Sequence, residues 1–117
     1  MSPAHNKSVV LEAVLAALDA GQVPERSMLR DAVRELLSAL ARRAPGRSVE
    51  VRVPPYGAVQ VGAGPRHTRG TPPNVVEMDP VTWVQLATGR VGWDEAVTQG
   101  RITASGTRAD ISGYIPM

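Results

Sequence analysis

The chain has 117 residues, of which 43% are hydrophobic, and its thirteen basic and eleven acidic residues give a formal net charge of +2 at pH 7. This length predicts a single domain over residues 1–117, with residues 1–5 expected to form a disordered tail. Cysteine is absent and only His5 and His67 can supply imidazole ligands, which excludes disulfides and thiolate sites and leads us to expect no metal and no cofactor.

The first part of the chain carries two helical patterns. Apolar residues recur at intervals of three and four over residues 9–20 and predict an amphipathic helix that ends at Gly21. A second helix is predicted to begin at Pro24 or Ser27 and to end before the Pro-Gly pair at 45–46. Its apolar residues form a wide stripe with arginines opposite, which is typical of a helix that packs on one face.

After residue 46 the pattern changes to a period of two. Alternating valines predict a hairpin over residues 48–62, with turn residues at 54–57. Residues 62–74 are rich in glycine and proline and predict an irregular loop. The short apolar run at 75–78 predicts a third strand.

Two short helices and a strand are predicted in the last third of the chain. The Asp-Pro pair at 79–80 combines a capping residue with a proline suited to the first helical position, and this helix is expected to end at Gly89. A second helix is predicted between Gly92 and Gly100, and residues 101–105 predict a fourth strand. The tail that follows predicts one helical turn.

Positive charge is concentrated in the middle of the chain, where residues 42–69 include six arginines and only one acid, Glu50. Arg66, His67 and Arg69 could hold a carboxylate or phosphate, or they could satisfy backbone carbonyls and fix the loop to the body of the domain. Single-strand nucleic-acid binders alternate basic and aromatic residues. Only one aromatic residue, Tyr56, lies near this cluster, so we expect no nucleic-acid partner.

The sequence offers little to catalysis. No P-loop, nucleophile elbow or HExxH pattern occurs, and a dinucleotide motif starting at Gly62 fails because its third position is His67. We therefore expect a protein that is not an enzyme. The most apolar N-terminal run is interrupted by Glu12 and Asp19 and lacks a basic flank, which predicts a cytoplasmic protein with no stable membrane insertion.

Residues 78–106 resemble the sterol carrier protein family. The matching segments are DPVTW at 79–83, LATG at 86–89 and AVxxGRIxxxG at 96–106, and together they place several helix and strand ends in a fixed order. The preceding segment HTRGTPPNVVE is similar to a bacterial sterol carrier-like subgroup.

This resemblance implies an α/β (α+β) sandwich in which helices cover a mostly antiparallel sheet of about four to five strands. It also implies an apolar tunnel between the two layers that binds a lipid or another apolar ligand. The positions of this chain that correspond to the tunnel are Leu86, Val97, Ile102, Ile111 and Ile115. Arg66, His67 and Arg69 are then candidates for contact with an anionic head group.

An alternative remains open. The core could be filled by side chains, and the domain would then serve as a protein–protein interaction module or as a homodimeric accessory subunit. An empty apolar cavity of about 300 Å³ would cost on the order of 7 kcal/mol, which equals the whole stability of many domains. A tunnel must therefore be filled by side chains, by a ligand or by a partner, and cavity volume separates the two interpretations.

Overall fold

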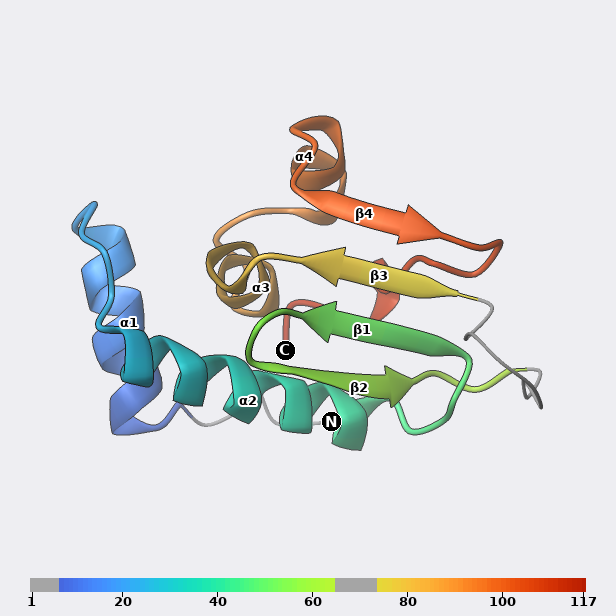
Figure 1. Cartoon of the computed structure of the whole chain (residues 1–117), viewed down its shortest axis with the longest axis horizontal. Coiled ribbons are helices and arrows are strands. Elements are labelled where there is room, and N and C mark those ends of the chain that lie inside the picture. Colours follow the sequence, from blue (N-terminus) through green and yellow to red (C-terminus); the bar gives the residue numbers. More distant parts are fainter. Residues whose placement is uncertain (1–6, 65–73) are drawn as a thin grey trace.

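The computed structural model describes residues 7–64 and 74–117. Four α-helices, four strands and one short 3₁₀ turn follow one another in these residues (Figure 1). Their bounds are α1 (Val9–Asp19), α2 (Arg26–Arg43), β1 (Val49–Val53), β2 (Gly57–Val61), β3 (Val75–Met78), α3 (Pro80–Ala87), α4 (Trp93–Thr98), β4 (Ile102–Ser105) and the turn η1 (Ser112–Tyr114).

The four strands form one sheet in the order β2-β1-β3-β4. β1 pairs with β2 and β3 with β4 in antiparallel fashion, whereas β1 and β3 are parallel. The register places Val51 opposite Val59 on one side and Val76 on the other. The expected α+β class with a mostly antiparallel sheet is confirmed, with four strands in the described residues.

The two faces of the sheet differ because side chains alternate along each strand. The three valines of β1 are buried, while Glu50 and Arg52 between them are partly exposed and form an ion pair. The register puts Glu77 of β3 beside Arg52 on the same face. One face of the sheet therefore packs against the helices and the other carries charged groups.

The long helix α2 lies at the centre of the helical layer and contacts α1, α3 and β2. Its buried stripe includes Leu36 and Leu40. Trp83 of α3 is fully buried, and its indole Nε1 donates a hydrogen bond of 3.3 Å to the carbonyl oxygen of Val33. This bond satisfies the polar atom of a large core side chain and connects α3 to α2.

Helix α2 begins with a different cap from the one predicted. Glu25, rather than Pro24 or Ser27, is the N-cap, and its carboxylate accepts hydrogen bonds from the backbone N–H groups of Ser27 and Met28. The Ser27 hydroxyl also donates to it, and these hydrogen bonds lower the pKa of Glu25. A carboxylate two and three residues before free helical N–H groups can satisfy both, which explains why Glu replaces the usual capping residues here.

The predicted turn in the tail is confirmed as η1. Ile111, directly before it, is fully buried in the core, and Ile115, directly after it, is partly buried. At the end of the chain the N–H of Met117 donates a hydrogen bond of 3.0 Å to the carbonyl oxygen of Ala87. The last residues therefore lie beside the C-terminal end of α3 (Figure 1).

Candidate functional site

A pocket of about 330 Å³ lies where α3, α4 and the tail of the chain meet. We call it the C-terminal pocket. It is lined by Leu86, Val91, Gly92, Trp93, Asp94, Glu95, Ser112, Ile115 and Pro116. Its volume falls at the lower end of the range of small-molecule sites, and five of its nine lining residues are apolar with side chains larger than alanine.

Each wall of the C-terminal pocket comes from a different segment. Leu86, near the end of α3, is almost completely buried, and Val91 in the connection to α4 is 7% exposed. Trp93 is the first residue of α4 and is partly buried. Ile115 and Pro116 close the side formed by the tail. The pocket therefore depends on contacts between segments that are far apart in the sequence.

The end of α3 is shaped to let the tail approach. Gly89 follows the helix with φ of +80°, a conformation that glycine adopts without strain. A Cβ at this position would lie 3.4 Å from Pro116, so the tail passes directly over the glycine. The hydrogen bond from Met117 to Ala87 satisfies one of the carbonyl groups left free at the helix end and holds the tail in place.

The polar groups of the C-terminal pocket are acidic or neutral. Asp94 and Glu95 line it from the first turn of α4, and Ser112 lines it from η1. The carboxylate of Glu95 accepts a hydrogen bond of 3.4 Å from Gln99. Lysine, arginine and histidine are absent from the described residues that line the pocket.

The residues predicted for the tunnel occupy different environments. Leu86 and Ile115 line the C-terminal pocket together. Ile111 is fully buried and Ile102 is 9% exposed, and both belong to the packed core. Val97 is 45% exposed on α4. The structure therefore brings two of the five residues to this pocket, and ligand contact stays a prediction for all five.

The sequence did not single out Val91 or Trp93 as site residues. Trp93 is only partly buried and forms a pocket wall.

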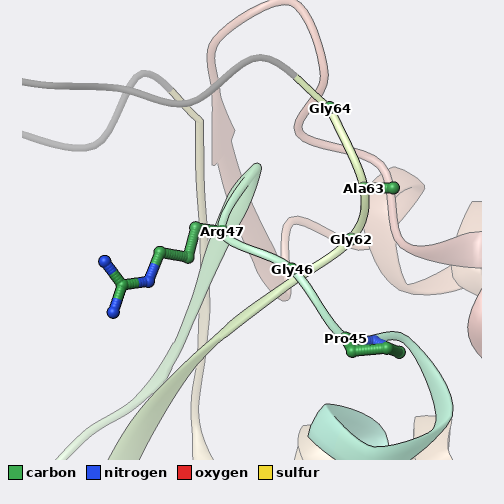
Figure 2. A pocket seen from close by; sticks show the side chains of 6 residues that line it. All are labelled: Pro45, Gly46, Arg47, Gly62, Ala63 and Gly64. Carbon is green, nitrogen blue, oxygen red and sulfur yellow. The ribbon is translucent and has the colours of Figure 1, made fainter.

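A second pocket, of about 610 Å³, lies where the ends of β1 and β2 approach α2. It is lined by Pro45, Gly46, Arg47, Gly62, Ala63 and Gly64. Figure 2 shows the Arg47 side chain extending away from the backbone at Gly46 and Gly62. A Cβ on Gly46 would lie 1.9 Å from the carbonyl oxygen of Gly62, so this crossing of two backbones requires glycine. Few apolar side chains line this pocket, which makes it a poorer site for hydrocarbon.

The predicted head-group residues Arg66, His67 and Arg69 lie outside the described residues, so their contact with an anion stays a prediction. Within residues 7–64 and 74–117, no group of three or more His, Asp or Glu side chains is placed to hold a metal ion. No helix in this described part of the chain combines the length and apolar character needed to cross a membrane.

Comparison with protein-family models gives a match over most of the chain. The model of a family described as bacterial SCP ortholog matches residues 25–117. This range begins at the N-cap of α2 and includes the whole sheet and every residue that lines the C-terminal pocket. A comparison with curated proteins finds no match.

Proposed function

This chain belongs to the family of bacterial SCP orthologs, and we propose that it binds a small apolar molecule, or the apolar end of a lipid, in the C-terminal pocket without catalysing a reaction. The observation that carries the proposal is the convergence of apolar side chains from three separate segments on one hollow. Leu86 comes from α3, Trp93 from α4 and Ile115 from the tail. Such a concave apolar surface with a few polar groups is the usual form of a small-molecule site.

The volume of the pocket limits the size of the ligand. About 330 Å³ corresponds to roughly eleven groups of the size of a water molecule or a methylene, at about 30 Å³ each. An alkyl chain of about ten carbons, or one to two rings, would fill it. A longer chain or a sterol would extend out of the pocket.

Energetics indicate that hydrocarbon contact alone gives weak binding. Burial of ten methylene groups contributes about 8 kcal/mol, and association costs at least about 4 kcal/mol. The remaining 4 kcal/mol or so corresponds to a dissociation constant near the millimolar range. Tighter binding requires that the polar end of the ligand is recognised as well.

The tryptophans of the chain provide a direct test. Trp93 forms a pocket wall, whereas Trp83 is fully buried in the core. We expect 10-bromodecan-1-ol to quench the fluorescence of the protein in a saturable manner, because bromine in the pocket contacts Trp93. The variant Trp93→Phe should lose this quenching.

Two further variants form a matched pair for the same titration. Ile115→Glu places a charge in the apolar wall and should abolish saturable quenching. Val23→Glu introduces the same side chain at an exposed valine that does not line the pocket, and quenching should be retained. Absence of saturable quenching in the native protein, together with a stable dimer in sedimentation, would reject the proposal in favour of an interaction module.

A further inference from the structure

The polar side of the C-terminal pocket carries negative charge. Asp94 and Glu95 are adjacent in sequence, both line the pocket, and both are exposed at the start of α4. The Asp94 side chain has no hydrogen bond or ion pair with any other described residue, and Glu95 accepts only the long hydrogen bond from Gln99. Both carboxylates can therefore interact with a group that enters the pocket.

Two arginines near this region in the sequence are engaged elsewhere. Arg90 binds both carboxylate oxygens of Asp19 through Nε and Nη2, at 2.8 Å each. Arg101 donates to Thr82 and Gln85, and its Nη1 lies 3.4 Å from the amide oxygen of Gln99. Neither arginine lines the pocket, so neither directly neutralises the two carboxylates there.

From this arrangement we propose that the C-terminal pocket selects apolar molecules whose polar group is neutral or cationic, and that it discriminates against carboxylates such as fatty-acid anions. The inference rests on the proposed function, because it specifies the ligand class of the same pocket. An ammonium group at the polar side is attracted by Asp94 and Glu95. A hydroxyl can donate a hydrogen bond to either carboxylate, whereas a ligand carboxylate is repelled by both.

The direction of this selectivity is opposite to that of the predicted contact with Arg66, His67 and Arg69, which would favour an anion. Those residues lie outside the described part of the chain, whereas the acidic pair lies in the pocket lining. Asp94 and Glu95 also stand in the first turn of a helix, where acids stabilise the helix itself. A test must therefore separate ligand selectivity from helix stability.

Three probes of equal chain length separate ligand selectivity from helix stability. Decylammonium, decan-1-ol and decanoate, each below its aggregation concentration, are titrated into the full chain at pH 7 with Trp93 fluorescence as the readout. We expect decylammonium to bind roughly tenfold or more tightly than decanoate at low salt, with decan-1-ol between them. The difference should shrink in about 1 M salt, where charge interactions are screened.

The double variant Asp94→Asn/Glu95→Gln should bring the three affinities together while leaving that for decan-1-ol almost unchanged. A matched control, Glu12→Gln/Asp31→Asn, alters the net charge equally at exposed residues that do not line the pocket and should keep the selectivity. Comparison of three ligands within one variant removes any effect of helix stability.

The outcomes distinguish this inference from the function on which it rests. Equal binding of decanoate and decylammonium by the native chain would overturn the selectivity and leave apolar binding intact. Selectivity that persists in the double variant would also overturn it, because another group would then be responsible. If none of the three probes binds, the proposed function and the selectivity fall together.

Discussion

Ile111 and Val97 are both aliphatic residues of the last quarter of the chain, yet their environments are opposite. Ile111 has no exposed surface and packs within the core, while Val97 is 45% exposed. On α4 the preceding residue, Ala96, is the one that faces the core with no exposed surface. Neighbouring residues point about 100° apart around a helix, and on α4 it is Ala96 rather than Val97 that lies in the buried core.

This contrast predicts different stabilities. Ile111→Ala should lower the free energy of unfolding by about 2–5 kcal/mol, because it removes buried methyl and methylene groups and leaves a cavity. Val97→Ala should change it by no more than about 0.5 kcal/mol. Urea unfolding followed by circular dichroism measures both. A loss for Val97→Ala as large as that for Ile111→Ala would show that α4 is packed differently.

The pair formed by Asp19 and Arg90 predicts a dependence on pH. The hydrogen bond from Arg90 is the main cause of the lowered pKa of Asp19, whose ordinary value is 3.8. An acid with a lowered pKa in the folded state stabilises the protein above its unfolded pKa, and this contribution is lost as pH falls through the folded pKa. Asp19 is half exposed, so the effect is small.

Asp19→Asn should therefore lower the urea midpoint slightly at pH 7, and the difference from the native chain should disappear below the pKa of Asp19. Arg90→Gln should give the same loss, and the double variant should lose no more than either single one. Strictly additive losses would show that the two side chains do not interact in solution.

At the scale of elements, the bounds of helices and strands follow from local signals. The Asp-Pro pair at 79–80 marks the start of α3, and glycines mark the ends of α3 and α4, as predicted. The choice of strand partner does not follow in this way. β3 lies parallel to β1, and not beside β2, the strand that precedes it in sequence. The choice of partner depends on long-range packing, and the alternation of apolar and polar residues along a strand does not indicate it.

The same difference between local signals and long-range packing explains which residues of the pocket could be predicted. Leu86 and Ile115 were predicted through family resemblance, which carries information about the whole fold. Trp93 and Val91 become pocket walls only because the tail returns to the end of α3, and nothing in their local sequence indicates that return.

The N-cap of α3 predicts how much this helix start contributes to stability. Asp79 accepts hydrogen bonds of 3.1 Å from the N–H groups of Val81 and Thr82. Asp79→Ala should lower the free energy of unfolding by about 1 kcal/mol, and Asp79→Ser should restore most of the loss. Thermal and urea unfolding check both variants. Equal stability of Asp79→Ala and the native chain would mean that packing of Trp83 alone fixes the start of the helix.

At the scale of the whole molecule, both proposals depend on the position of the tail. Residues 115–117 supply one wall of the C-terminal pocket and the hydrogen bond to Ala87, but the strands and the central helix α2 do not depend on them for pairing. A ligand that binds only the folded state raises its stability by about 2.7 kcal/mol at a concentration of 100 times the dissociation constant. Ligand-induced stabilisation therefore reports whether the pocket binds the ligand.

Ending the chain at Tyr114 should separate folding from binding. We expect the shortened protein to retain its circular dichroism spectrum and to melt several degrees lower, because it loses the packing of Ile115 and the bond to Ala87. The rise in melting temperature that a saturating apolar ligand gives the native chain should be absent. Met117→Ala keeps the backbone N–H and the pocket wall, so its ligand-induced rise should persist even though it is somewhat less stable. An equal rise in the shortened chain would place the ligand elsewhere in the fold.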